Sequence, residues 1–386
     1  MDVKELAIEK HREWKGKIEV VSRTPIKTKE QLSIAYTPGV AAPCMEIAKD
    51  HSKVYDFTRR GNLVAVITDG TAVLGLGDIG PEAAMPVMEG KCALFKEFAD
   101  VDAIPLCVNS KDPDEIVRTI ELIGLSFGGI NLEDISAPRC FEIEQKLKER
   151  LPIPVFHDDQ HGTAIIVGAA VINSAKLIGK PLSELEIVIN GAGAAGIAIA
   201  KFLMLLGVGN LILCDIHGIL APGAEGMNQA QEQMSQVTNR DRRTGTLADA
   251  MVGADVFIGV SKPNMVTPAM IQSMNEKPVI FAMANPVPEI MPEEALAAGA
   301  YIVGTGRSDF PNQINNVLAF PGIFKGALRA RARDITDEMK VGAAYGIAGI
   351  IPENELRPDY ILPDPFNPAV AENVAKAVEN AVKRGE

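Results

Sequence analysis

The sequence predicts an α/β protein of two domains, a parallel α/β domain over residues 1–160 followed by a doubly wound domain over residues 161–386. Three observations predict this architecture. The chain has 386 residues, a comfortable length for two domains. Short apolar runs alternate with helical patterns, as in parallel α/β sheets. The pattern then restarts between Phe156 and Gly162 with a long apolar helix, a strand and a glycine-rich turn.

The first domain is expected to contain a parallel sheet. A helix is predicted within DPDEIVRTIELIG (112–124), where Asp112 is a good N-cap and Pro113 suits the first helical position. Helices that alternate with buried apolar strands favour parallel pairing. The expected strands are residues 63–68, 103–108, 128–132 and 154–157.

The second domain is expected to be doubly wound. It opens with the apolar helix TAIIVGAAVINSAKLIG (163–179), and a helix over 197–207 follows the glycine-rich turn. An amphipathic helix that packs on the body is predicted for 368–386. The expected strands are residues 187–190, 211–215, 255–261, 278–285 and 301–306.

Composition excludes several classes of function. The net charge of -12 argues against a nucleic-acid partner, because a phosphate backbone requires a basic face. The N-terminus lacks the apolar core of a signal peptide, and no run is expected to span a membrane. The five cysteines are scattered without a C-x-x-C motif, which predicts reduced thiols in the cytoplasm.

Two glycine runs match G-x-G-x-x-G, and only the second has the context of a dinucleotide site. GLGDIG (75–80) is followed by Pro81, and the next strand ends without an acid, so it is interpreted as a bend beside an active site. GAGAAG follows a strand, opens a helix and precedes a strand that ends in Asp215, which suits a ribose 2′-hydroxyl. The predicted nicotinamide dinucleotide site comprises Gly191, Ala192, Gly193, Ala194, Ala195, Gly196 and Asp215.

Two acidic pairs follow predicted strands. Glu133 and Asp134 lie in NLED, and Asp158 and Asp159 lie in FHDD. Parallel strands end at a common edge, where such carboxylates repel one another unless a cation or protons neutralise them. Oxygen ligands favour Mg²⁺ or Mn²⁺ over zinc. The alternative is that one pair consists of surface acids that cap a helix.

Two histidines of HDDQH, His157 and His161, have the i, i+4 spacing of a zinc site. No H-E-x-x-H glutamate lies between them, so hydrogen-bonding roles are favoured. Lys91 lies among small and apolar residues, a setting that lowers a lysine pKa, although taken alone such a lysine is more often an ordinary surface residue.

Amide and tyrosine side chains complete the candidates. Asn285 and the pair Asn315–Asn316 follow strands of the second domain, where they either face a nicotinamide or carboxylate substrate or serve in turns. Tyr36 is either an active-site residue or a core tyrosine.

Seven ordered motifs together resemble malic enzyme, specifically its short bacterial branch, from about Tyr36 to about Gly322. The resemblance implies oxidative decarboxylation of L-malate to pyruvate and CO₂ with Mg²⁺ or Mn²⁺ and with NAD, or alternatively NADP. It also implies a homodimer. The motifs are YTPGVA, TDGTAVLGLGDIG, EGKCALFK, NLEDISAP, FHDDQHGTA, GAGAAG and MANPVPEI.

Carried over by motif, the resemblance implies a role for each candidate. GLGDIG becomes the loop beside the malate site. One position departs from the pattern: Ala72 stands where large-subunit animal enzymes carry an arginine that clamps substrate carboxylate. The implied roles are metal ligation by Glu133, Asp134 and Asp159, general base by Lys91 with Asp158, acid by Tyr36, and contacts with nicotinamide or substrate by Asn285, Asn315 and Lys91.

Two rival functions remain open at the level of sequence. An oxaloacetate decarboxylase on the same scaffold would use the metal and Lys91 without turning over a cofactor, and the intact GAGAAG with Asp215 argues against it. A nucleotide-sensing binding protein would lack catalysis, and the presence of every candidate catalytic residue argues against that reading.

Overall fold

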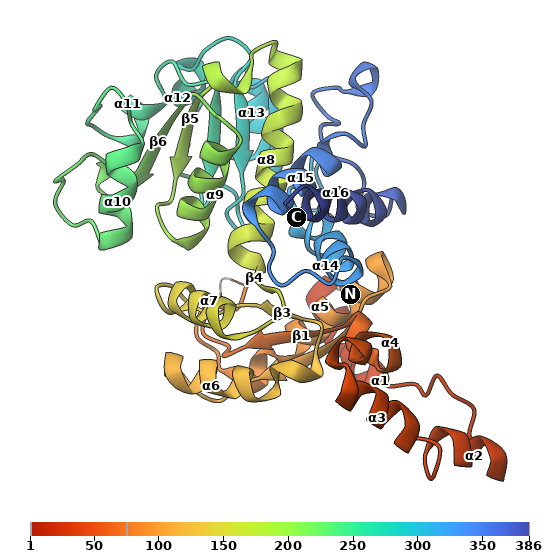
Figure 1. Ribbon diagram of the computed structural model, residues 1–386. Coiled ribbons are helices and arrows are strands. Elements are labelled where there is room, and N and C mark those ends of the chain that lie inside the picture. Colours follow the sequence, from red (N-terminus) through yellow and green to blue (C-terminus); the bar gives the residue numbers. More distant parts are fainter. Residues whose placement is uncertain (1, 75, 386) are drawn as a thin grey trace.

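The computed structural model describes residues 2–74 and 76–385 and contains two sheets joined by one long helix, α8 (Asp158–Ile178) (Figure 1). Gly75, the first glycine of GLGDIG, lies outside the described residues. The mixed α/β architecture with parallel sheets confirms the predicted fold class.

The first sheet is parallel throughout, in the order β2-β1-β3-β4. Alternate residues of β1 face opposite layers of helices. Val64 and Val66 pack towards α5 (Pro81–Ala99). Ala65 and Ile67 pack towards α6 (Pro113–Ile123) and α7 (Arg139–Arg150). Asp112 accepts hydrogen bonds from two amides at the start of α6, which confirms the predicted cap. The strands are β1 (Leu63–Thr68), β2 (Asp102–Cys107), β3 (Gly129–Leu132) and β4 (Val155–His157).

The second sheet has the order β10-β9-β8-β5-β6-β7, with only the short β7 antiparallel. Because β6 and β8 flank β5 on opposite sides, a crevice opens at the carboxyl end of β5. The strands are β5 (Glu186–Asn190), β6 (Asn210–Asp215), β7 (Gly218–Ile219), β8 (Val256–Gly259), β9 (Val279–Ala282) and β10 (Ile302–Thr305). The helices are α9 (Ala194–Leu205), α10 (Gln229–Val237), α11 (Leu247–Met251), α12 (Pro268–Gln272) and α13 (Pro292–Ala297).

The last helices of the chain are α14 (Phe320–Arg329), α15 (Asp337–Ala348) and α16 (Ala369–Gly385). They return to the first domain, where the rings of Phe320 and Phe324 pack edge-on against Phe95 of α5, with centroid separations of 4.7 and 5.3 Å. Such aromatic pairs add stability beyond the area they bury. The core therefore runs continuously from the first sheet through α8 to the C-terminal helices.

Helix α8 has the length and composition of a membrane span, contrary to the expectation from the sequence. However, 72% of the most apolar stretch of this helix is buried inside the protein, where it packs against both domains. Its apolar character thus reflects a core helix that packs on several sides.

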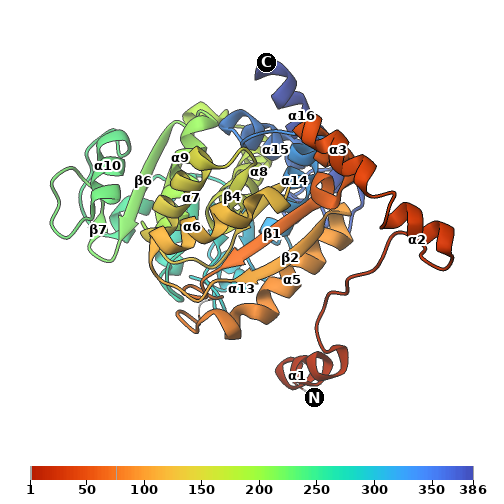
Figure 2. The same ribbon diagram turned by 60° about the horizontal axis from the view of Figure 1, so that its bottom comes forward.

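An N-terminal arm comprises α1 (Val3–Trp14), α2 (Lys29–Ala35), α3 (Ala41–Lys49) and α4 (Val54–Phe57). None of these helices contains a buried residue. Figures 1 and 2 show α2 at the outer end of this arm, away from both sheets. A hydrogen bond of 3.0 Å from the amide of Lys17 to Glu89 fastens the arm to α5.

Candidate active site

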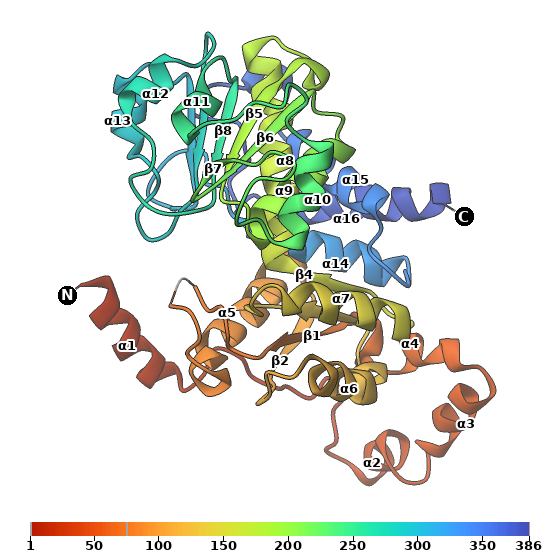
Figure 3. The ribbon, with the colours of Figure 1, turned by 90° about the vertical axis from the view of Figure 1, so that its left-hand side faces the viewer.

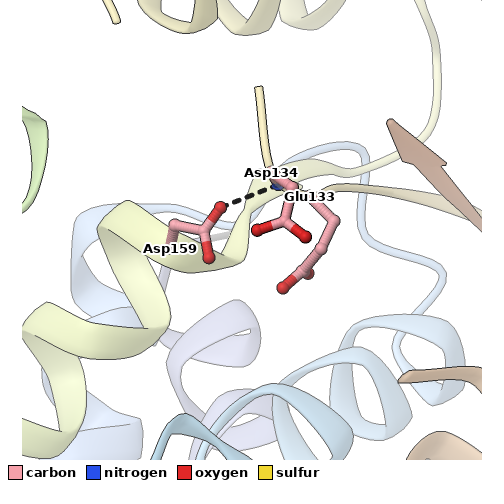
Figure 4. A group of neighbouring side chains, drawn as sticks. All are labelled: Glu133, Asp134 and Asp159. Carbon is pink, nitrogen blue, oxygen red and sulfur yellow. Dashed lines mark hydrogen bonds between the residues drawn. The ribbon is translucent and has the colours of Figure 1, made fainter. Parts of the chain in front are cut away.

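Three carboxylates meet where β3 and β4 end. Glu133 and Asp134 follow β3, and Asp159 lies in the first turn of α8 (Figure 4). One oxygen from each lies within 4.8 Å of the others, and the amide of Asp134 donates to Asp159 at 2.9 Å. Asp134 adopts a left-handed backbone with φ 54°, which is uncommon for a non-glycine residue and typical of functional turns.

Burial makes this carboxylate group electrostatically costly. Glu133 and Asp134 are 5% and 4% exposed, and Oδ2 of Asp134 has no hydrogen-bond partner among the described residues. Burial, together with the neighbouring negative charges, raises the pKa of both carboxyl groups above their ordinary values. Hard, partly unsatisfied oxygen atoms that repel one another are suited to Mg²⁺ or Mn²⁺. The donor set therefore fits the predicted metal.

Lys91 reaches this group from α5. Its Nζ lies 2.6 Å from Oδ2 of Asp158 and 2.9 Å from Oε1 of Glu133, and its side chain is only 8% exposed. The surface-lysine alternative is therefore wrong. The ammonium also lies 4.2 Å from the ring centroid of Phe320, so a C-terminal helix forms one wall of the site.

The predicted lowering of the Lys91 pKa is not observed. Burial by itself lowers this pKa, but the charges of Asp158 and Glu133 more than offset it, and the net shift is upward. Burial raises the pKa of Asp158 to about 7, with Lys91 opposing part of that shift. The resemblance associated Lys91 with Asp158, but nothing in the sequence indicated that Glu133 contacts it as well.

Two asparagine side chains bind carboxylates of the site, and the sequence did not predict these contacts. Asn316 donates to Oδ2 of Asp158, and Asn131 donates to Glu133 at 2.8 Å. Asn315 uses its Oδ1 to accept from the amide of Val317, a turn role, so its contact with substrate stays a prediction. Asn315 and Asn316 are neighbours in the motif NQINN, so the sequence alone does not show which of them contacts Asp158.

Arg139, which no motif indicated, organises the loop beside the carboxylates. Its guanidinium donates to Asp69, Thr71 and Ser136 at 2.9–3.0 Å. The amide of Ala72 in turn donates to the carbonyl of Asp134 at 2.9 Å. The position that lacks the expected arginine thus lies directly beside the candidate metal ligands.

Of the two histidines of HDDQH, His161 makes the predicted hydrogen bonds, but the prediction is wrong for His157, whose buried ring nitrogens have no hydrogen-bond partner among the described residues. Nε2 of His161 lies 2.9 and 3.0 Å from the two oxygens of Glu144 on α7, which confirms the predicted role for this residue. Although burial alone raises the Glu144 pKa, His161 holds it low, at about 2. His157 is 1% exposed, and burial lowers its pKa.

The glycines of GAGAAG line the crevice at the end of β5. Gly191 has φ 116°, and a Cβ there would lie 2.7 Å from the carbonyl oxygen of Val260. A Cβ on Gly196 would lie 1.8 Å from the oxygen of Gly191, so this glycine allows the helix to pack on the turn. Gly193 faces open space, which leaves its backbone accessible to a pyrophosphate.

The other nucleotide-site candidates surround this crevice. Asp215 ends β6, accepts a hydrogen bond of 2.7 Å from the amide of His217 and lines a cavity of about 480 Å³. Asn285 is exposed in the loop after β9. Glu289, fully buried, accepts from the amides of Ala284 and Ser261 at 3.0 Å and so fixes this loop against the one after β8.

Tyr36 stands apart from every other candidate. It caps the C-terminus of α2 on the arm and is 66% exposed. Its hydroxyl makes no hydrogen bond with any residue that the structure describes. The core-tyrosine alternative is therefore wrong, and the tyrosine is not brought to Lys91 of its own chain.

Comparison with known proteins decides the family. A model of the malic enzyme N-terminal domain matches residues 15–148, and a model of the malic enzyme NAD binding domain matches residues 160–383. The chain belongs to the malic enzyme family. This confirms the resemblance that the ordered motifs indicated.

Relatives within the malic enzyme family are similar over nearly the whole chain. A bifunctional malic/malolactic enzyme of Bacillus subtilis is 56% identical, covering 99% of this chain and 93% of the relative. An NAD-dependent malic enzyme of Geobacillus stearothermophilus is 54% identical over 96% of this chain and 77% of the relative. The crystal structure of the NAD-dependent malic enzyme of Thermotoga maritima is 50% identical with a TM-score of 0.92, covering 97% and 98% of the two chains. The reaction of the malic enzyme family is the oxidative decarboxylation of malate with NAD(P).

The repulsion between the grouped carboxylates predicts that the substitution Asp134→Asn stabilises the metal-free protein. The folded-state pKa of Asp134 lies above its unfolded value, so folding at neutral pH must either bury a charge or take up a proton; this cost begins to shrink as the pH falls below the folded pKa and is gone only below the unfolded pKa. Asparagine also tolerates the left-handed backbone. We expect the free energy of unfolding in chelator to rise by about 1–3 kcal/mol, measured by denaturant titration.

Two comparisons test this expectation. Asp241→Asn, at an exposed position, should leave stability unchanged. With Mn²⁺ present, the unchanged protein should be more stable than Asp134→Asn, because a ligand stabilises the folded protein that binds it more tightly. Lower stability of metal-free Asp134→Asn would contradict the electrostatic argument.

Proposed function

We propose that this chain catalyses the oxidative decarboxylation of L-malate to pyruvate and CO₂, with NAD as hydride acceptor and Mg²⁺ or Mn²⁺ held by Glu133, Asp134 and Asp159. The observation that carries the proposal is the buried contact of Lys91 with both Asp158 and Glu133, beside the three grouped carboxylates. This arrangement provides a proton-transfer pair adjacent to a cation site. The cysteines in the structure are free, which supports a reducing compartment, and we propose the cytoplasm.

Lys91 and Asp158 serve as a linked pair in this proposal. Oxidation at C2 of malate requires the C2 hydroxyl to lose a proton, and Lys91 can accept it only after releasing its own. Asp158, 2.6 Å away and with a raised pKa, is placed to accept that proton. Asn316 donates to the same Oδ2 of Asp158 that Lys91 contacts and so helps to orient the carboxylate. When bound, a divalent cation supplies Lewis acidity for the substrate oxygens and offsets the negative charge that raises the Lys91 pKa.

NAD is proposed over NADP because Asp215 ends the second strand of the nucleotide domain. A carboxylate there accepts bonds from ribose hydroxyls and repels a 2′-phosphate. Asp215→Ser is expected to narrow the ratio of kcat/KM for NAD over NADP by about tenfold, which corresponds to about 1.4 kcal/mol of lost discrimination. Steady-state kinetics with both cofactors measure this ratio. Asp241→Ser, at an exposed site, should not alter it, and a larger kcat/KM with NADP in the unchanged protein would refute the assignment.

Tyr36 is proposed to act in the site of a partner subunit within a homodimer. Its exposure at the end of an arm without buried residues supports this arrangement. The apolar side chains of Val20, Val21 and Ile26 are also exposed along the arm, which supports a second copy as its binding surface. In that site Tyr36 would deliver a proton to C3 of enolpyruvate, the product of decarboxylation.

Mixed dimers test this arrangement. Tyr36→Phe and Lys91→Ala are each expected to be inactive alone. If the tyrosine acts in trans, each heterodimer contains one site with both native residues, and random subunit exchange should restore about a quarter of wild-type activity. If Tyr36 acts within its own chain, no site in the heterodimer is complete and no activity returns. Proton exchange at the pyruvate methyl group, followed by NMR, reports the Tyr36 step separately.

One assay distinguishes the proposed reaction from its rivals. Absorbance of NADH is followed with malate, NAD and Mn²⁺, and pyruvate and lactate are both quantified, because one relative is named a malic/malolactic enzyme. Equal yields of NADH and pyruvate are expected. Decarboxylation of oxaloacetate without NADH formation from malate would indicate the decarboxylase, and nucleotide binding without turnover would indicate a sensor.

A further inference from the structure

A buried carboxylate joins the two loops that follow β8 and β9, residues 260–267 and 283–291. Helix α8 leads away from the first domain and β5 runs back towards it, so the carboxyl ends of the parallel strands face that domain (Figure 3). A dinucleotide binds across the switch point at these ends. Since Asp215 on β6 suits the adenosine ribose, we expect the nicotinamide half on the opposite side of β5, over β8 and β9.

Glu289 connects these loops through both of its carboxylate oxygens. Its Oε1 accepts from the amide of Ser261 and its Oε2 from the amide of Ala284, each at 3.0 Å. Ala284 directly precedes Asn285, the exposed asparagine expected at the cofactor. An ionised carboxylate has two equivalent acceptor oxygens and no donor, so it matches two N–H groups on opposite sides. Glu289 therefore sets the spacing between the two loops.

The Glu289 side chain is fully buried without a counter-charge. Burial raises the pKa of Glu289, and the amides of Ala284 and Ser261, rather than a cation among the described residues, oppose that shift. A Cβ on Gly259, the last residue of β8, would lie 2.3 Å from Cδ of Glu289, so the glycine leaves room for the carboxylate. Burying an acid at such a cost indicates that the bridge between the loops is needed.

The loop after β8 has a second anchor that does not involve Glu289. The side chain of Asn190, which ends β5 directly before the glycine run, donates to the hydroxyl of Ser261 at 2.8 Å. The carbonyl of Asn190 also accepts from the amide of Val260 at 2.9 Å. Loss of the Glu289 carboxylate should therefore leave the glycine run and this loop attached to each other, and should release the loop that contains Asn285.

We propose that Glu289 is a positioning residue for the nicotinamide half of the cofactor. By bridging the loops after β8 and β9, it keeps Asn285 in place to contact the nicotinamide, without touching the cofactor itself. The adenosine half, which is assigned to Asp215 and the glycine run, does not depend on Glu289. This inference rests on the NAD cofactor proposed above.

Two cofactor forms test this role without turnover. Isothermal titration calorimetry of the full chain gives a Kd for NADH and a Kd for ADP-ribose, which lacks the nicotinamide. Glu289→Gln keeps the size of the side chain but replaces one acceptor oxygen by a donor that faces an amide, so the bridge is broken. We expect its Kd for NADH to rise by about tenfold and its Kd for ADP-ribose by less than about twofold. The emission of bound NADH should move towards that of free NADH.

A second variant reaches the same bridge from β8. Gly259→Ala retains the carboxylate but displaces it from the two amides, and should give the same pattern as Glu289→Gln. Asp215→Ser should instead weaken the binding of both ligands, and Glu294→Gln, at an exposed glutamate on α13, should weaken neither. Circular dichroism verifies that each variant is folded.

The outcomes separate this inference from the proposed function. Wild-type affinity for NADH in folded Glu289→Gln and Gly259→Ala would overturn the positioning role, and so would equal weakening of NADH and ADP-ribose, which indicates general damage to the domain. Failure of the unchanged protein to bind NADH would instead overturn the cofactor assignment.

Discussion

Exhaustive chelation is expected to lower malate-dependent NAD reduction to background, and added Mn²⁺ or Mg²⁺ to restore it better than Ca²⁺. Glu133 and Asp134 in the buried turn after β3 lie close to Asp159 at the start of α8, and their charges repel one another, so a cation is the partner that permits all three to be ionised. The looser coordination of Ca²⁺ suits this small group less well. NADH absorbance at graded metal concentrations gives the measurement.

Substitutions at the proposed metal ligands distinguish loss of metal binding from a general loss of folding or activity. Glu133→Gln and Asp159→Asn should weaken Mn²⁺ binding, measured by calorimetry, as well as activity. Glu142→Gln, at an exposed glutamate on α7, should do neither. Full activity after removal of all divalent metal, or unchanged Mn²⁺ affinity in Glu133→Gln, would contradict the metal assignment.

Lys91→Ala is expected to lower kcat for malate oxidation by roughly 10²–10⁴-fold, the usual effect of losing a positioned base. The ammonium lies against Asp158 and Glu133 in a pocket with little access to water, so no solvent molecule readily replaces it. Decarboxylation of supplied oxaloacetate should also slow, because charged Lys91 helps to hold the enolate. Rates with malate and with oxaloacetate measure the two effects.

A matched lysine on the same helix provides the control. Lys96→Ala, at an exposed position of α5, should retain activity. Lys91→Ala removes the counter-charge of two buried carboxylates, so thermal denaturation must show that the variant is folded. A folded Lys91→Ala protein with wild-type kcat would remove this residue from the mechanism.

The sequence predicted the parts of this protein that depend on local pattern. Alternating apolar runs identified the four strands of the first sheet, and the Asp112–Pro113 pair identified the start of α6. The glycine spacing of GAGAAG, with a strand before it and Asp215 after it, indicated the crevice that the structure shows at β5. These features need only a few consecutive residues to be recognised.

The features that were missed depend on contacts between distant segments. Arg139 bonds with residues about 70 positions earlier, and no short motif contains both partners. The upward shift of the Lys91 pKa arises from carboxylates directly after β3 and at the start of α8, which converge only in the fold. The exposure of Tyr36 reflects how the arm leaves the body, which local composition does not determine.

The packing of α14 against α5 has a consequence for synthesis on the ribosome. Phe95 belongs to the first domain, yet the rings that pack on it, Phe320 and Phe324, emerge after the whole nucleotide domain. The nascent first domain thus keeps part of its apolar interior open to solvent, or to a chaperone, until translation is nearly finished. Late-made residues also build a wall of the pocket around Lys91, so a prematurely terminated chain contains the carboxylates without an enclosed site.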